Sequence, residues 1–256
     1  MPCCPGSAAT FAQRKDADVR PGDRLEAVIF DVDGTLVDSE RDGHRVAFNR
    51  TFEEAGLPDH WDLATYGKLL RITGGNRRMA HWFERNGMPP AQARELGERL
   101  HPRKTEIMRE LIAEGAVRPR PGVTALIDAL IARGVAVHVA TTGTRAWVDP
   151  LLERSFGDRF DTVVTGTEVT DLKPSPAAYL EVLRLTGASP SHTVAVEDSS
   201  NGVRAAVAAG LTCIASYNSY TRDDDLEGAK LIVSSFDNPA LVGWFRQRMP
   251  QMVSGA

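Results

Sequence analysis

Short runs of apolar, β-branched residues recur along the chain and alternate with segments whose apolar positions follow helical spacing. The runs predict strands at 25–30, 135–140, 161–166, 193–197, 212–216 and 230–234. The helical pattern predicts helices at 145–155, 175–187, 200–209 and 237–248, and one at 123–134 that ends on Gly134. Because the strands are apolar on both faces, we expect an α/β fold with a parallel sheet covered by helices on both sides.

A long helical insertion separates the first strand from the second. Segments 43–56, 76–87 and 91–115 have helical patterns, and no good strand lies among them. We therefore predict a helical cap subdomain inserted into the core. The expected boundaries are a disordered leader at 1–23, a core formed by 24–40 and 119–248, the cap at 41–118, and a flexible tail at 249–256.

Composition and charge narrow the classes of function. The chain has 256 residues, 42% of them hydrophobic, which is enough for a sizeable core. Its net charge of −4 argues against nucleic acid or an anionic membrane surface as a partner. Three cysteines make no disulfide framework, no apolar run is long enough to span a bilayer, and no secretory signal is recognisable. We expect a cytoplasmic protein.

Polar side chains follow four of the predicted strands. Asp31 and Asp33 follow the first, and the remaining groups are Thr141, Thr142 and Gly143 after the second, Lys173 after the third, and Glu197 and Asp198 after the fourth. Ligands of parallel α/β sheets bind beyond the carboxyl ends of the strands, so we expect these residues to converge.

The chemistry of these side chains suits phosphoryl transfer. Carboxylates without His or Cys make an oxygen-only site, which favours Mg²⁺ over Zn²⁺. A lysine and strand-end hydroxyls can stabilise a phosphoryl group. An aspartate such as Asp31 can attack phosphorus and form an aspartyl-phosphate, while Asp33 can serve as general acid and then base.

The four motifs DVDGT (31–35), TT (141–142), LKPSP (172–176) and VEDSSNG (196–202) resemble, in order and spacing, those of the haloacid dehalogenase-like phosphohydrolase superfamily. The resemblance implies a Rossmann-like core with an α-helical cap. It also implies the roles of the motif residues. The expected catalytic residues are Asp31, Asp33, Thr141 and Lys173, and the expected Mg²⁺ ligands are Asp31, Asp33 through its backbone carbonyl, Glu197 and Asp198.

The cap resembles a narrower group, the xylulose-1,5-bisphosphate phosphatases, which are relatives of β-phosphoglucomutase. The similar segments are DSERDGHRVAFNRTFEEAGL (38–57), LLRITGG (69–75), HPRKTE (101–106) and YTRDD (220–224). This resemblance implies hydrolysis of xylulose-1,5-bisphosphate to xylulose-5-phosphate. We expect the protein to be a monomer or a weak dimer. The implied substrate-binding residues are Glu40, Thr73, Gly74, Gly75, Arg78, His101, Arg103, Lys104, Thr142 and Gly143. Two positions depart from the pattern, since Asn76 replaces a common lysine and Gly143 a common hydroxyl residue.

Other interpretations stay open at this point. The same core would serve a β-phosphoglucomutase, which passes the phosphoryl group to a sugar hydroxyl, or a phosphatase of sugar monophosphates. A dehalogenase needs no second acid, so the presence of Asp33 argues against that function. A non-catalytic phosphate-binding protein would be indicated by the loss of a motif residue, and no motif residue is lost. The segment HPRK can also be a solvated helix face, and His44 is interpreted as a packing residue.

Overall fold

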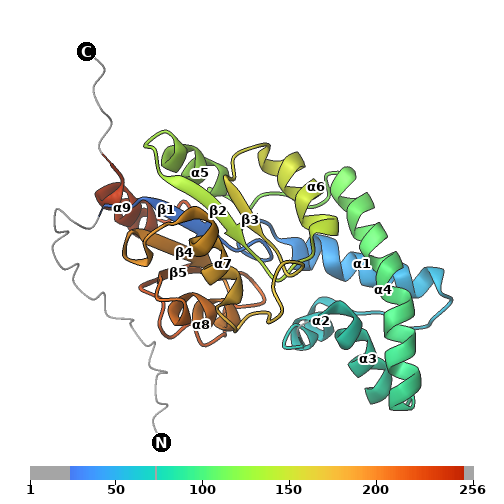
Figure 1. Cartoon of the computed structure of the whole chain (residues 1–256). Helices are drawn as coiled ribbons and strands as arrows, with labels where there is room; N and C mark the ends of the chain where they lie inside the picture. The colour runs from blue at the N-terminus through green and yellow to red at the C-terminus, as the bar shows by residue number, and fades with distance from the viewer. Residues whose placement is uncertain (1–23, 73, 251–256) are drawn as a thin grey trace, which may run out of the picture.

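A six-stranded parallel sheet forms the centre of the molecule (Figure 1). The computed structural model describes residues 24–72 and 74–250, so the predicted leader, most of the tail and Thr73 lie outside the described residues. The strands are β1 (Ala27–Phe30), β2 (Ala136–Ala140), β3 (Thr162–Val164), β4 (Thr193–Glu197), β5 (Thr212–Ser216) and β6 (Leu231–Val233). All the predicted strands are thereby confirmed.

The strand order β3-β2-β1-β4-β5-β6 puts β1 in the middle of the sheet. Phe30, the last residue of β1, is level with Val139 of β2 on one side and Val196 of β4 on the other. The chain reverses its winding direction at β1, and such a point is where α/β sheets form a ligand crevice. Asp31 therefore enters this crevice with the ends of β2 and β4 beside it.

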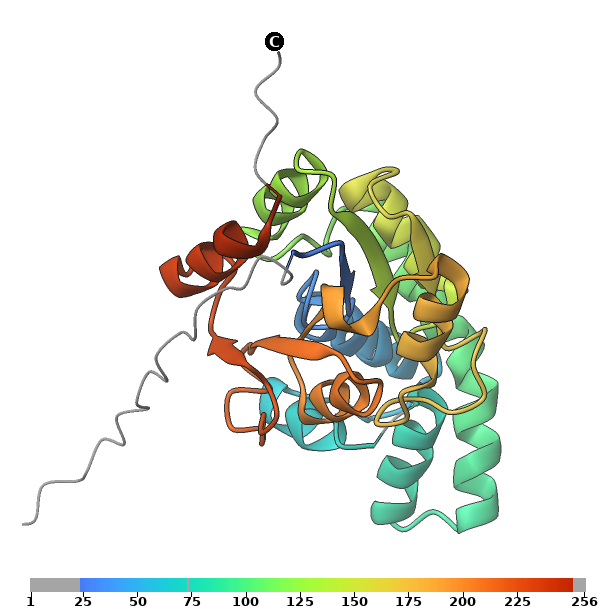
Figure 2. The same cartoon turned by 60° about the vertical axis from the view of Figure 1, so that its left-hand side comes forward.

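Helices cover both faces of the sheet (Figures 1 and 2). One apolar cluster joins the sheet to α5 (Val123–Ile131), α6 (Arg145–Phe156) and α9 (Pro239–Arg248). The other joins it to α7 (Ala177–Thr186) and α8 (Ser200–Ala208). Burial of apolar side chains on both faces explains why the strand sequences are continuously apolar rather than alternating.

The end of α5 differs from the prediction. The helix stops at Ile131 and its C-cap is Ala132, so Gly134 is not the capping residue. Gly134 follows two residues later with a φ of +70°, and its N–H donates to the carbonyl of Ile131. The left-handed conformation that glycine favours is thus used in the turn after the helix, where the chain enters β2.

The residues between β1 and α5 form a helical layer beyond the carboxyl ends of the strands. Its elements are η1 (Glu40–His44), α1 (Arg45–Glu54), α2 (Leu63–Leu69), α3 (Gly75–Arg85) and α4 (Pro90–Ala113). They enclose their own aromatic cluster, which includes Phe48, Phe52 and Trp61, and α3 with the first half of α4 projects away from the sheet in both views (Figures 1 and 2).

Helix α2 has no counterpart among the predicted helices. It spans only Leu63–Leu69, too short for a clear apolar period, and it begins where Asp62 accepts a 2.7 Å hydrogen bond from the N–H of Thr65. Within residues 24–72 and 74–250, no helix combines the length and apolar character needed to cross a membrane.

Candidate active site

Lys173 joins the ends of three strands. Its Nζ donates to Asp31 Oδ1 and to Glu197 Oε1, each at 2.6 Å, and to the carbonyl of Ala140 at 2.7 Å. The lysine and both carboxylates are buried. An ammonium has three protons, and each has an acceptor here, so Lys173 is held in one orientation beneath Asp31.

Three carboxylates gather around this lysine. One oxygen each from Asp31, Glu197 and Asp198 lies within 4.8 Å of the others. Burial raises the pKa of Glu197 to about 7, and burial with the neighbouring charges of Asp31 and Glu197 raises the pKa of Asp198. One ammonium cannot balance three carboxylates, and an oxygen-only set of this kind fits a hard divalent cation. The cluster can therefore hold a metal ion.

Asp33 points away from this cluster and toward the cap. Its Oδ1 accepts a hydrogen bond from Ser39 Oγ and lies 3.1 Å from His44 Nε2, while Lys104 Nζ lies 2.6 Å from His44 Nδ1. An ammonium can only donate, so His44 accepts at Nδ1 and donates from Nε2 to Asp33. Burial and the charge of Lys104 hold the pKa of His44 well below its ordinary value, which keeps the ring neutral.

His44 was thus missed as a site residue, because its sequence signal was only that of a buried polar group. It lies on η1, eleven residues after Asp33. The side of its ring packs against Trp147, with ring centroids 4.7 Å apart. The packing role is real, but the ring also connects Asp33 to Lys104.

The two threonines in the loop after β2 differ in burial. Thr142 lines the cleft between core and cap, whereas Thr141 is fully buried and its Oγ1 accepts from the N–H of Gly143 at 3.1 Å. A Cβ on Gly143 would lie 2.3 Å from the Trp147 ring. The departure at Gly143 has a physical reason: a hydroxyl residue there would displace the tryptophan that supports His44.

The cleft between the core and the cap has a volume of about 1160 Å³. Asp31, Asp33 and Lys173 line its core side, and Glu40, Gly74 and Arg78 line its cap side, all of them predicted site residues. The cap also contributes cations that sequence reasoning missed: Arg41, Lys68 and Arg71. Arg41 lies on η1, and Lys68 and Arg71 lie on the short, unpredicted helix α2 and just after it, so their only sequence signal was scattered positive charge.

Arg78 is a buried cation of the cap. It donates to Tyr66 Oη at 2.9 Å, to the carbonyl of Leu69 at 3.1 Å and to that of Ile72 at 3.3 Å. Tyr66 in turn donates to Glu40. These contacts fix the position of Arg78 beside Gly74 at the start of α3.

The remaining cap residues are placed differently from one another. Arg103 lies on the outside of α4 and pairs with Glu54, Glu106 and Glu110, so it does not line the cleft. Lys104 is buried behind His44. His101 is half-buried against Gly75, where a Cβ would lie 2.8 Å from His101 Nε2. Only part of the HPRK segment therefore approaches the site, and it does so from behind the cleft wall.

The chain is similar in sequence and in fold to known proteins. A family model described as haloacid dehalogenase-like hydrolase matches residues 25–210. Protein CbbY of Rhodobacter capsulatus is 44% identical over 80% of this chain and 91% of its own length. The crystal structure of CbbY from Rhodobacter sphaeroides with phosphate has a TM-score of 0.74 at 39% identity, covering 84% of this chain and 96% of that one.

A crystal structure of a mutant of the same Rhodobacter sphaeroides CbbY holds xylulose-(1,5)bisphosphate. It matches this chain with a TM-score of 0.74 at 38% identity, again over 84% of this chain and 96% of that one. The similarity thus extends over both the sheet and the helical layer that faces it.

Proposed function

The chain belongs to the haloacid dehalogenase-like hydrolase family and is a phosphohydrolase, and on that premise we propose that it is a Mg²⁺-dependent phosphatase that converts xylulose-1,5-bisphosphate to xylulose-5-phosphate. One observation carries the proposal. Asp31, held by Lys173 at 2.6 Å, lines a cleft whose opposite side carries basic side chains from the cap. The bisphosphate complex of the CbbY relative supports the choice of substrate.

The reaction begins at Asp31. Lys173 holds the carboxylate of Asp31 through Oδ1. A carboxylate oxygen of Asp31 attacks phosphorus, and an O–P bond to Asp31 forms as the bond from phosphorus to the sugar oxygen breaks. Lys173 and Thr142 line the cleft and can stabilise the charge on the phosphoryl oxygens. Thr141 supports this loop from beneath, and its hydroxyl proton remains free to donate.

Asp33 manages the proton in both halves of the reaction. It gives a proton to the departing sugar oxygen, and it then takes one from the water that hydrolyses the aspartyl-phosphate. Ser39 and His44 hold its carboxylate from the cap side. Proton transfer depends on distance and angle, so these two contacts are part of the catalytic geometry.

The acidic cluster fits Mg²⁺. The carboxylates of Asp31, Glu197 and Asp198 would hold it, together with the backbone carbonyl of Asp33, and it would supply positive charge for the phosphoryl group. Glu197 is itself fixed by Lys173 and by the Tyr179 hydroxyl at 2.6 Å. These contacts position Glu197 before any cation binds.

The cap side of the cleft carries cations that can bind the second phosphate of the substrate. Arg78 is buried at the start of α3, next to Gly74, and Lys68 and Arg71 reach the same cleft from the end of α2. Charge-assisted hydrogen bonds from arginine and lysine are strong contacts to phosphate. Glu40 also lines the cap side of the cleft and can accept from sugar hydroxyls.

Phosphate release from a panel of sugar mono- and bisphosphates, with β-glucose-1-phosphate isomerisation assayed in parallel, tests the proposal. We expect the highest kcat/KM for xylulose-1,5-bisphosphate, full dependence on Mg²⁺ and no isomerisation. Asp31→Asn should abolish turnover, because an amide is a poor nucleophile. Near-wild-type turnover in that variant would exclude the covalent mechanism, and isomerisation without phosphate release would identify a mutase.

A further inference from the structure

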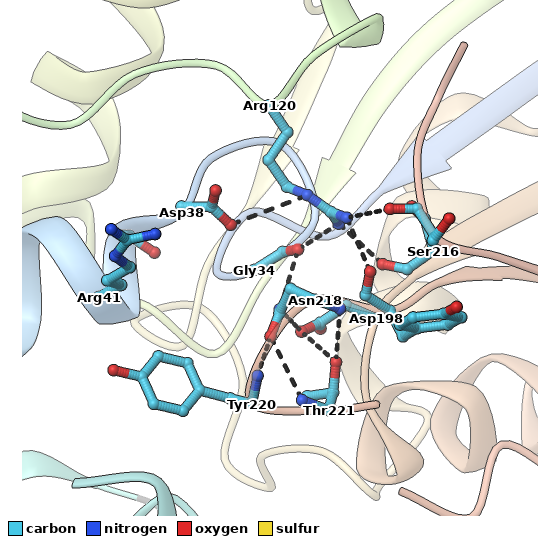
Figure 3. Close-up of polar contacts among 12 residues, drawn as sticks. Gly34, Asp38, Arg41, Arg120, Asp198, Ser216, Asn218, Tyr220 and Thr221 are labelled. Carbon is cyan, nitrogen blue, oxygen red and sulfur yellow. Dashed lines mark hydrogen bonds and ion pairs between the residues drawn. The ribbon is translucent and has the colours of Figure 1, made fainter. Parts of the chain in front are cut away.

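The segment that follows β5 reaches back to the acidic cluster (Figure 3). Asn218 Nδ2 donates to Asp198 Oδ2 at 2.6 Å and to the carbonyl of Gly34 at 3.3 Å. Gly34 directly follows Asp33 in the chain, and Asp198 follows β4. One side-chain amide therefore contacts both loops that carry the proposed metal ligands.

The orientation of this amide is fixed by its own loop. Asn218 Oδ1 accepts from the N–H groups of Tyr220 at 2.8 Å and Thr221 at 3.3 Å, and the N–H of Asn218 donates to Thr221 Oγ1 at 3.1 Å (Figure 3). Because Oδ1 is occupied by two donors, Nδ2 must face Asp198. The amide is held before any ligand enters the site.

Gly34 shows how closely these groups approach one another. Its φ is +81°, and a Cβ there would lie 2.2 Å from Asp198 Oδ2 and 2.6 Å from Asn218 Nδ2. The carbonyl of Gly34 also accepts from Arg120 at 2.6 Å, and Arg120 donates at 2.7 Å to the carbonyl of Ser216, the last residue of β5. The loops after β1 and β5 are therefore tied together around Asp198.

Asp198 differs from the other two acids in its partner. Lys173 forms ion pairs with Asp31 and Glu197, but over residues 24–72 and 74–250 no ion pair joins Asp198 to a lysine or arginine. A neutral amide holds it instead, so its negative charge is not neutralised by a paired cation. Because Oδ2 accepts from Asn218, and from Thr221 at 3.5 Å, Oδ1 is left for another ligand.

We propose that Asn218 is a positioning residue for the metal site: its amide fixes the carboxylate of Asp198 so that Oδ1 faces the bound Mg²⁺. The inference rests on the proposed function, because it needs the metal site described there. Groups that orient a metal ligand from behind commonly contribute about 10- to 100-fold to metal affinity. Asn218 acts through Asp198 and the Gly34 carbonyl.

The test is a calorimetric titration of the substrate-free, full-length protein with Mg²⁺. Asn218→Ala should weaken Mg²⁺ binding about 10- to 100-fold. Thr221→Val, which keeps the shape of the side chain but removes the hydroxyl that contacts both Asn218 and Asp198, should weaken it less. Asn86→Ala, at an exposed asparagine ending α3, should bind Mg²⁺ as the wild type does.

Activity and stability separate positioning from a merely structural role. Raising the Mg²⁺ concentration should restore most of kcat in Asn218→Ala, whereas a general loss of folding would not be recovered this way. If both loop variants melt at a lower temperature without metal but bind Mg²⁺ with wild-type affinity, the positioning role is refuted. Should Asn218→Ala fail to fold, wild-type Mg²⁺ affinity in Thr221→Val would refute the positioning role by itself.

An error in the proposed function would appear in the Mg²⁺ titration of the wild type. If the wild type itself takes up no Mg²⁺, the metal site is wrong and this inference falls with it. If the wild type binds Mg²⁺ and the variants bind equally well, only the role of Asn218 is overturned.

Discussion

Replacing Lys104 by methionine removes a buried charge from behind Asp33, the proposed general acid, while keeping the length of the side chain. Lys104 is 5% exposed, and its Nζ lies 2.6 Å from His44 Nδ1 and 4.7 Å from the centre of the Phe48 ring. The methionine can occupy the same apolar channel against Phe48. The change therefore deletes the donor to His44 without opening a large cavity.

The expected loss follows from the tautomer of His44. Without the ammonium, Asp33 Oδ1 alone favours the ring proton on Nε2, and in the other tautomer two lone pairs face each other across the 3.1 Å between Nε2 and Oδ1. A hydrogen bond to a charged group contributes about 1.5–3 kcal/mol. At about 1.4 kcal/mol per tenfold in rate, kcat should fall roughly 10- to 160-fold.

The assay compares two substrates. Because a sugar alkoxide needs a proton from the proposed general acid Asp33 in order to leave, Lys104→Met should reduce kcat for a sugar monophosphate and for the bisphosphate by similar factors. Arg103→Met is the matched control: it removes the neighbouring cation, whose partners are Glu54, Glu106 and Glu110 on the surface, and should leave kcat unchanged on both substrates.

A selective loss would refute this reasoning. If Lys104→Met lowers kcat/KM for the bisphosphate but spares the sugar monophosphate, Lys104 binds the second phosphate directly. In that case His44 does not depend on it to hold Asp33. Unchanged kinetics on both substrates would show that His44 keeps its tautomer without the ammonium.

Three further predictions concern acid–base chemistry, stability and pH. Asp33→Asn should lower kcat by about 10²- to 10⁴-fold yet leave Mg²⁺ affinity intact by calorimetry, because its side chain points away from the acidic cluster. Arg120→Met should destabilise the fold by about 3–5 kcal/mol, since Arg120 donates to four carbonyls, and should lower Tm by roughly 6–20 °C in scanning calorimetry. Burial lowers the pKa of His101 to about 4, so below pH ~6.5 the unfolded chain binds a proton that the folded one does not. The urea concentration at the unfolding midpoint should therefore be lower at pH 5 than at pH 7, and this difference should be smaller in His101→Gln.

The core of the site was predictable because its residues lie at fixed places in a regular pattern. Asp31, Lys173 and Asp198 each follow a continuously apolar strand, and parallel strands bring their carboxyl ends to one edge. Burial on both faces makes such strands easy to recognise. The convergence of these side chains then follows from the topology alone.

The cap was less predictable, because a helical pattern does not say which face of a helix meets the site. Arg103 and Lys104 are neighbours in sequence, but successive side chains on an α-helix point about 100° apart. Lys104 is therefore buried behind His44, while Arg103 lies in solvent with three glutamates. Asn218 was difficult to predict for a different reason. Its hydrogen bond to Gly34 joins residues 184 positions apart, and its neighbours in the sequence indicate only a polar turn.

The contacts of Asp33 connect chemistry to the position of the cap. Asp31 is fixed by Lys173 from within the core, so the nucleophile is ready whatever the cap does. Asp33, in contrast, is held by Ser39 and His44 at the entrance to the cap, and His44 is oriented by Lys104 on α4. A movement of α4 away from η1 would leave the nucleophile in place and release the general acid. We therefore expect proton transfer by Asp33, rather than attack by Asp31, to be the step that requires a closed cap. This requirement protects the aspartyl-phosphate from bulk water until the cleft is filled, because an unheld Asp33 is not positioned to activate water.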